Sequence, residues 1–249
     1  MISFINIEDI TIPTEGSFDS FTLDFYKIAY KTNLCGQARY GQDHYDLGEG
    51  GLIFTAPNQV FESPKSTALG YIFFIHPDFL LTYPLAKKIK LYGFFSYTTN
   101  EALHLSANEK ATIMSVFKII DDELKSRIDD FSHDVVISQK ELLLNYSNRF
   151  YNRQFITHKA VYKDLLVKIE EILTDYFNDT KPLDDGLPSV KYLADQVNVS
   201  PSYLSDMLRS LTGQNAKQHI HHKLIETAIE SLSTTRHSVS EIAYELGFE

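Results

Sequence analysis

The stretch SVKYLADQVNVS at residues 189–200 recurs 49 positions later as SVSEIAYELGFE at residues 238–249. Serine, valine and alanine are identical in the two copies, and the remaining apolar positions are similar. Asn198 of the first copy corresponds to Gly247 of the second, and both residue types accept the left-handed backbone conformation at low cost. Each copy therefore predicts a short helix that begins at a capping serine and ends in a sharp turn.

A second helix is predicted to follow the first copy directly. Ser200 can cap this helix, and Pro201 stands at its first position, where a missing N–H group is tolerated. Gly213 ends an apolar pattern of helical spacing that runs through Leu204, Leu208 and Leu211. Two short helices joined by a tight turn form a helix-turn-helix, and the small Ala194 lets them cross closely. The second helix of such a unit lies in the major groove of DNA.

A connecting helix is predicted over residues 216–233, between the two copies. At helical rise it is about 27 Å long, which would hold two recognition helices near the ~34 Å between successive major grooves. By itself, a single Ala-x-x-x-Asn pattern favours two helices of an ordinary bundle by about two to one. The duplicate, the Ser-Pro start and the connecting helix together favour DNA binding.

The same region resembles the AraC/XylS family of bacterial transcription regulators, specifically over residues 188–249 and more loosely elsewhere. This resemblance implies two helix-turn-helix units joined by a linker helix, behind an N-terminal cupin-like domain that binds an effector and dimerises. The matching residues of the first unit are Ser189, Val190, Leu193, Ala194, Val199, Ser200, Pro201, Ser202, Tyr203, Leu204, Ser205 and Gly213. Those that follow are Lys223, Leu224, Ala228, Leu232, Ile242, Ala243, Leu246, Gly247 and Phe248.

The chain departs from the family pattern at several positions. Ala216 and His219 stand where the family usually has Pro and Tyr, and Lys223 stands where it has Arg. The second recognition helix, with its Phe-Ser-x-x-Phe-Lys pattern, is absent before Glu249. We therefore interpret the chain as truncated within the second helix-turn-helix, at residues 238–249.

Composition indicates a globular protein, since 43% of the 249 residues are apolar and 22% are charged. A single cysteine, Cys35, excludes a disulfide scaffold or a cysteine-based zinc cluster and fits a reducing compartment. There is neither a secretion signal nor an apolar run that could span a bilayer. We expect a soluble, cytoplasmic protein without membrane partners. The net charge of −10 speaks against a nucleic-acid binder, so the DNA interpretation rests on motif geometry.

Glycine and proline divide the chain into three parts. Eight of the 11 glycines and five of the eight prolines lie before residue 94, and neither type occurs from residue 94 to 181. These residues mark turns, so the first part predicts short strands and the middle part helices. Strands are expected within residues 21–31, 37–47, 52–56 and 71–75, which suggests a small antiparallel barrel or sandwich. Core aromatics are expected at Tyr26, Tyr40, Tyr45, Phe54 and Phe73, some of which could line a ligand pocket.

Three helices are expected in the middle of the chain. The first begins at a capping box formed by Ser106 and Glu109, the second spans about residues 133–151, and the third covers an apolar face from residue 161 to 176. Residues 178–188 read as a linker or long loop. The predicted fold class is α+β with several domains: a cupin-like antiparallel β-barrel at 1–98, a helical dimerisation region at 99–155, and an all-α DNA-binding domain at 156–249.

The predicted DNA-binding residues lie in or beside the first recognition helix: Ser200, Ser202, Tyr203, Ser205, Asp206 and Arg209. Arg209 can reach a phosphate or a guanine, and the serine hydroxyls can bind at either. Asp206 could accept from cytosine N4, or it could be an ordinary exposed acid. Tyr203 is favoured as partly buried packing.

We expect no metal, no cofactor and no enzymatic activity. His219, His221 and His222 form a cluster that we interpret as a surface feature near phosphate rather than a metal site. Gly51 and Pro57 resemble the start of the second cupin motif. Gln59 and Glu62 replace its expected glycine and histidine, and His44 stands alone in the first motif region, so a catalytic metal is not favoured.

The predicted function is a sequence-specific transcription regulator whose partners are a double-stranded DNA operator, an unknown small-molecule effector, a second copy of the chain and, for an activator, RNA polymerase. Two alternatives stay open at this point. One is a cupin metalloenzyme with a helical appendage, and the other is an acidic module that binds a protein partner.

Overall fold

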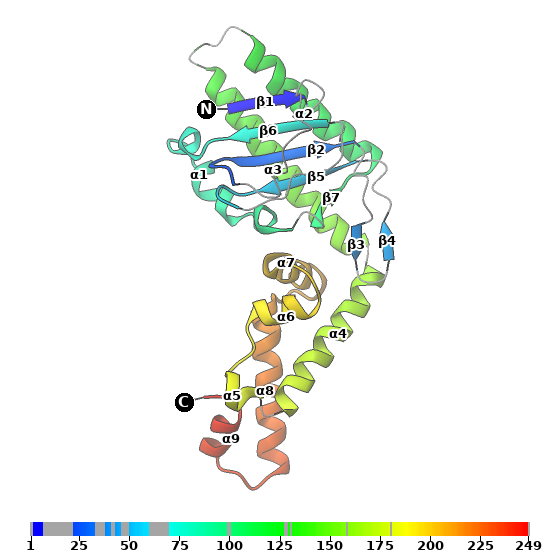
Figure 1. Ribbon diagram of the computed structural model, residues 1–249, viewed down its shortest axis with the longest axis vertical. Helices are drawn as coiled ribbons and strands as arrows, with labels where there is room; N and C mark the ends of the chain where they lie inside the picture. Colours follow the sequence, from blue (N-terminus) through cyan, green and yellow to red (C-terminus); the bar gives the residue numbers. More distant parts are fainter. Residues whose placement is uncertain are drawn as a thin grey trace, which may run out of the picture. The chain divides into compact units, whose positions relative to one another are not determined.

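The computed structural model describes residues 2–6, 22–32, 38–40, 43–45, 50–59, 70–98, 101–126, 129, 131–157, 159–179 and 181–248 (Figure 1). The chain divides into two compact units, Met1–Gln154 and Phe155–Glu249. All described strands lie in the first unit, which also contains long helices. All described elements of the second unit are helices, and the last residues of the helix that crosses the boundary also belong to it.

An antiparallel sheet organises the first unit. Its five strands, in spatial order, are β1 (Ile2–Asn6), β6 (Gly70–Ile75), β2 (Tyr26–Lys31), β5 (Gly51–Thr55) and β7 (Leu103–His104). A separate hairpin pairs β3 (Ala38–Tyr40) with β4 (Asp43–Tyr45). The predicted antiparallel sheet is thus confirmed, whereas the described strands form an open sheet with β1 and β7 at its edges. A cupin barrel is not seen in the described part of residues 1–98.

The strand boundaries differ from the predicted ones in three places. Residues 22–25 precede β2 without joining the sheet, and the single strand expected at residues 37–47 is a hairpin of two short strands. Strands β1 and β7 were not predicted from the sequence, because the first is isolated in a long turn-rich segment and the second has only two residues. Of the five expected core aromatics, Tyr26, Phe54 and Phe73 are buried; the side chains of Tyr40 and Tyr45 lie outside the described ones.

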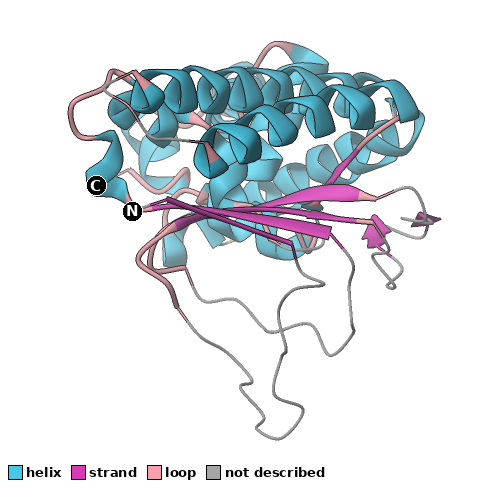
Figure 2. Cartoon of the chain, turned by 90° about the horizontal axis from the view of Figure 1, so that it is seen from above, coloured by secondary structure: helices cyan, strands magenta, loops and turns pink. Residues whose placement is uncertain are grey.

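One face of the sheet is covered by helix α3 (Ser132–Thr157), which passes behind the strands in Figure 1. Figure 2 shows the strands of the sheet nearly edge-on. On this face Ile28 stands beside Phe54 and Phe73 in the register of β2 with β5 and β6, and all three are buried. The ring of Tyr151 in α3 lies 6.2 Å from that of Phe54. Strand residues alternate between faces, so Lys27 and Thr55, which are register partners, lie on the opposite face.

Four short helical segments follow β6 and bind to α3. They are η2 (Pro77–Leu80), α1 (Leu85–Lys88), η3 (Ile89–Leu91) and η4 (Gly93–Ser96). Three hydrogen bonds join this segment to α3: the Tyr83 hydroxyl donates to Asp134 at 2.9 Å, Lys88 donates to Glu141 at 2.7 Å, and the Tyr92 hydroxyl donates to Asn145 at 2.9 Å. Ring contacts add to them, since the Phe94 ring stacks on that of Tyr151. These bonds hold the segment from residue 77 to 97 along the helix.

Helix α2 (Ala107–Lys125) begins at the predicted capping box. The Ser106 hydroxyl accepts from the Glu109 N–H group, and the Glu109 carboxylate accepts from the Ser106 N–H group. That carboxylate also binds the Arg153 guanidinium of α3 through two bonds of 3.0 and 2.8 Å. The second predicted helix is confirmed but is longer than expected, because α3 continues to Thr157.

The second unit consists of α4 (Lys159–Asn178), α5 (Lys181–Asp185), α6 (Val190–Gln196), α7 (Pro201–Thr212), α8 (Ala216–Thr234) and α9 (Val239–Glu245). Residues 178–188 are therefore not a simple linker. Pro182, at the second position of α5, is buried, and the Tyr176 hydroxyl of α4 donates to the Gly186 carbonyl at 2.8 Å. Proline is compatible with a first helical turn, which explains how α5 forms here. Among the described residues, no helix combines the length and apolar character needed to cross a membrane.

Candidate nucleic-acid interface

Helix α6 is the first helix of the repeated stretch. The Ser189 hydroxyl caps it by accepting from the Tyr192 N–H group at 3.0 Å. Leu193 and Ala194 are fully buried, so the close packing expected at the alanine is present. The turn after α6 places Asn198 in the left-handed conformation, with φ of 56°. This is the sharp turn that the sequence predicts at this position.

Helix α7 follows at once and is held at both ends. The Ser200 hydroxyl accepts from the Tyr203 N–H group at 3.2 Å, Pro201 stands in the first turn, and Gly213 ends the helix with φ of 80°. Its buried face is formed by Tyr203, Leu204, Met207 and Leu208, while Leu211 is only half-buried. Helices α6 and α7 are in contact and form the predicted helix-turn-helix.

The second copy repeats this local geometry at α9. Ser238 and Glu241 form a reciprocal capping box, and the helix ends at Gly247 with φ of 83°. A Cβ atom on Gly247 would collide with the Pro182 carbonyl oxygen, so this turn requires glycine where the first copy tolerates Asn198. Helix α8 joins the two copies and begins at a capping box of Asn215 and Gln218.

Four of the six predicted DNA-binding residues are accessible on α7. Ser202, Ser205 and Asp206 are partly exposed, and the Arg209 side chain is 56% exposed. These four residues share the side of α7 that faces away from Leu204 and Leu208. The structure thus brings together the polar face that the motif predicts.

The other two predicted residues are buried. Ser200 uses its hydroxyl as the helix cap, as described above. Tyr203 is fully buried, its hydroxyl lies 2.8 Å from that of Tyr162 in α4, and its ring lies 5.2 Å from the Phe155 ring. In this structure Ser200 and Tyr203 therefore position α7 instead of facing outward, and a direct part of either in DNA binding stays a prediction.

The structure adds an ion pair that sequence reasoning missed. The Arg209 guanidinium donates to the Asp206 carboxylate at 3.0 Å, one helical turn away. The i, i+3 spacing of opposite charges on a helix was a readable signal for this pair. Exposed pairs of this kind contribute little stability, about 0–1 kcal/mol, so Arg209 can exchange Asp206 for a DNA group.

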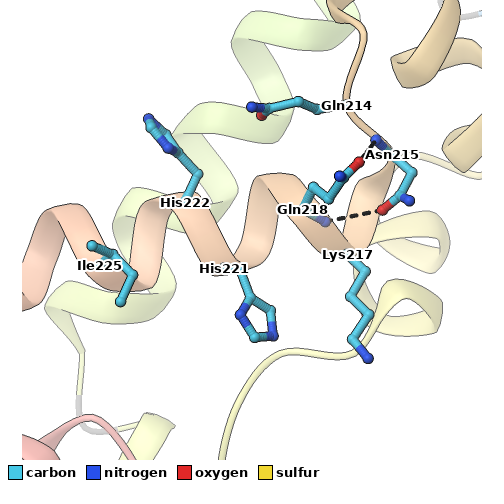
Figure 3. Close-up of a pocket in the computed structure, with 7 residues that line it drawn as sticks. All are labelled: Gln214, Asn215, Lys217, Gln218, His221, His222 and Ile225. Atoms are coloured by element: carbon cyan, nitrogen blue, oxygen red, sulfur yellow. Dashed lines mark hydrogen bonds between the residues drawn. The ribbon is translucent and has the colours of Figure 1, made fainter.

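The histidine cluster on α8 is divided between two environments. His221 and His222 line an open pocket of about 540 Å³ (Figure 3). His219 is turned elsewhere, with its Nε2 atom 2.9 Å from the Thr212 hydroxyl, and burial lowers its pKa. The other residues that line the pocket are Gln214, Asn215, Lys217, Gln218 and Ile225.

Within the described ranges, no three His, Cys, Asp or Glu side chains are grouped so that they could hold a metal ion. Two positions were considered for a cupin metal site. Glu62 is outside the residues that the structure describes, and the side chain of His44 is not described either.

Comparisons with known proteins agree with this geometry. A family model described as a helix-turn-helix domain matches residues 193–249, and this domain is of the AraC type. The chain is also similar to the uncharacterized HTH-type transcriptional regulator YfiF of Bacillus subtilis (strain 168), with 22% identity over 230 residues. That similarity covers 90% of this chain and 70% of the relative. No solved structure matches the chain.

Proposed function

We propose that the protein is a sequence-specific DNA-binding transcription regulator that presents α7 to the major groove of a double-stranded operator. The observation that carries this proposal is the geometry from α6 to α7, with a buried Ala194 at the crossing, a left-handed turn and a capped second helix. The recurrence of the capped helix and left-handed turn at α9 adds to it, because an ordinary helical bundle does not need the same unit twice. The similarity to a protein named as a transcriptional regulator points in the same direction.

The acidic charge of the chain sets a condition on this proposal. Arg209 is the only lysine or arginine between Tyr192 and Lys217, so the polar face of α7 offers a single strong cation. Phosphate contacts provide most of the affinity of a protein for DNA of any sequence. Affinity for random DNA should therefore be low, and binding should depend strongly on Arg209.

Replacing Arg209 by alanine is expected to weaken operator binding by about 1–3 kcal/mol if the guanidinium reads a guanine. If it contacts only phosphate, the loss should be similar for all sequences, and the slope of log K against log salt should fall by about one. Fluorescence anisotropy with operator and random duplexes over a salt series measures both quantities. Arg149→Ala is the matched control, because it removes the same charge from an exposed site in the other unit. Unchanged binding by a folded Arg209→Ala protein would contradict the assignment.

We further propose that the first unit dimerises and senses a small molecule in the cytoplasm. Its helices α2 and α3 expose large apolar side chains, namely Ile119, Val135 and Leu142, and Phe131 just before α3 is 72% exposed. A second copy of the chain would cover these groups. If the regulator activates transcription, RNA polymerase is a further partner.

Light scattering at tens of micromolar protein is expected to give about twice the chain mass of 28.5 kDa. Leu142→Glu should shift the protein toward the monomer, because it places a charge on the apolar surface of α3. Leu91→Glu, at a side chain that is 83% exposed in η3, is the control and should leave the mass unchanged. A monomeric wild-type protein at this concentration would exclude a stable dimer.

The regulator proposal as a whole is tested by mapping the DNA bound in the source cell and confirming the sites by mobility shift. The expected result is a small set of sites that share a sequence and lie upstream of genes. Capture of a protein partner together with no selected DNA would instead support an acidic interaction module, and would overturn the proposal.

A further inference from the structure

Lys140 is an unusual ionisable residue among those that the structure describes in the first unit. It lies on α3, its residue is 0% exposed, and its Nζ atom has no hydrogen-bond partner in the structure as described. Burial of an unpaired ammonium group is strongly unfavourable. Lys140 therefore does not stabilise the fold through its amine, and its presence at a buried position indicates another role.

Two aromatic rings surround the Lys140 amine. Its Nζ atom lies 4.3 Å from the centre of the Phe79 ring and 5.1 Å from that of Phe73. Ring faces attract a cation but supply no strong hydrogen-bond acceptor. Burial lowers the pKa of Lys140 to about 7, so the amine is neutral in a large fraction of molecules at neutral pH.

The acidic side chains nearest to Lys140 along α3 are already engaged. Asp134 accepts from the Tyr83 hydroxyl, and Glu141 accepts from Lys88. Neither has a described contact with Lys140. The amine thus keeps a free electron pair in its neutral form, and a desolvated neutral lysine is a nucleophile.

Phe79 separates this amine from the surface. Phe79 belongs to the short η2 segment, is itself partly exposed, and touches the exposed His133 ring at 4.9 Å. Its ring therefore reaches from the surface to the amine. A change in the rotamer of this one side chain would admit a small molecule to Lys140.

We propose that Lys140 is a covalent binding site for a small apolar aldehyde. The Nζ electron pair attacks the carbonyl carbon, a proton moves from nitrogen to oxygen, and loss of one water leaves a C=N double bond. No oxidant or reductant is consumed. The apolar rings around the nitrogen suit this neutral imine, which carries no charge and no N–H group, whereas an anion would need several donors.

A small apolar aldehyde would then be the effector of the proposed regulator. The role as effector rests on the proposed function, whereas the binding site at Lys140 does not. Imine formation prevents Lys140 from carrying the charge of an ordinary protonated lysine and adds an apolar group beside Phe73 and Phe79. The helices proposed for dimerisation include α3, so the site lies on an element that could transmit the change.

Trapping of the imine tests the site directly. The full chain is incubated with butanal and cyanoborohydride near pH 7, and alkylated lysines are quantified by peptide mass spectrometry. Lys88 is the internal reference, because its amine is paired with Glu141 and that bond raises its pKa. At this pH the neutral fraction of Lys140 exceeds that of an ordinary lysine on the order of a thousandfold. Allowing for restricted access, we expect Lys140 to react at least tenfold faster than Lys88, with a rate that rises through pH 7.

Two variants decide between the outcomes. Lys140→Met should lose the fast-reacting site and leave Lys88 unchanged, and Phe79→Leu should keep it. If Lys140 in the native protein reacts no faster than Lys88, the proposal is wrong. A mobility shift with and without butanal then separates the two proposals: fast trapping without any DNA binding would retain the site and remove the regulator.

Discussion

Replacing Lys140 by methionine is expected to stabilise the first unit by about 1–4 kcal/mol near neutral pH. Methionine has a similar length and no charge, so it can fill the space between Phe73 and Phe79 without the cost of a buried, unpaired amine. Urea unfolding followed by circular dichroism measures the change. Lys88→Met is the matched control and should cost at most about 1 kcal/mol, because it removes a partly exposed pair with Glu141. A Lys140→Met protein less stable than the wild type would contradict the expectation.

The gain should depend on pH in a definite direction. The pKa of Lys140 is about 7 in the folded protein and about 10.5 in the unfolded chain, so between these values the unfolded chain binds more protons. Wild-type stability therefore rises with pH in this window, and below pH 7 the cost of the buried charge is fully present. The advantage of Lys140→Met should shrink by up to about 1.4 kcal/mol per pH unit above 7.

The pH dependence of stability has to be compared between the wild type and Lys140→Met, because Lys140 is not the only lysine with a lowered pKa. Burial and the neighbouring Lys31 lower the pKa of Lys27 to about 8. Lys27 thus contributes a slope of the same sign in both proteins, and the difference between them isolates Lys140. Equal pH slopes in the two proteins would show that Lys140 stays protonated in the folded state.

Leu208→Ala is expected to destabilise the second unit by about 2–5 kcal/mol, and to abolish DNA binding through loss of the folded helix-turn-helix. Leu208 is fully buried in α7, and its truncation leaves a cavity against α6 and the other core side chains. Leu232→Ala in α8 is the control, because the same atoms are removed from a side chain that is 49% exposed. Thermal unfolding by circular dichroism should separate the two variants clearly. Equal melting temperatures would contradict the assignment of Leu208 to the core.

The helix-turn-helix could be predicted because its signals are local. The capping serines at 189, 200 and 238, the left-handed turns at Asn198 and Gly247, and Gly213 at the end of α7 each act over a few residues. Their effect on the backbone can therefore be predicted from the neighbouring residues alone, without knowledge of distant contacts. The capping box at the start of α2 was predicted for the same reason.

The sheet could be predicted only in outline, because strand pairing joins distant segments. The edge position of β1 beside β6 depends on contacts across about seventy residues, and β7 exists through its pairing with β5. No periodicity within Ile2–Asn6 or Leu103–His104 reveals these partners. The buried state of Tyr203 is likewise decided by Tyr162, forty-one positions earlier.

The position of Lys140 in the sequence already indicates that it lies on the buried face of its helix. Buried residues of α3 recur at helical spacing, at Val136, Ile137, Leu143, Leu144 and Ser147, and Lys140 falls within that series. A lysine in an apolar stripe either extends its amine to solvent or is buried for a reason. Only the positions of Phe73 and Phe79, which come from other elements, decide between these two outcomes.

The hydroxyl pair between Tyr162 and Tyr203 bears on where this protein can be divided. The segment that matches the family model begins at residue 193. The fully buried Tyr203 of its recognition helix nevertheless forms its hydroxyl hydrogen bond with Tyr162 of α4, which precedes that segment. Helix α4 also contacts α8 and contributes Ile169, Leu173 and Tyr176 to the core. A fragment cut at the family boundary would leave the Tyr203 hydroxyl buried without that partner and the apolar face of α8 uncovered. A piece that keeps these contacts therefore has to include α4, which begins at Lys159, well before the part that sequence comparison identifies.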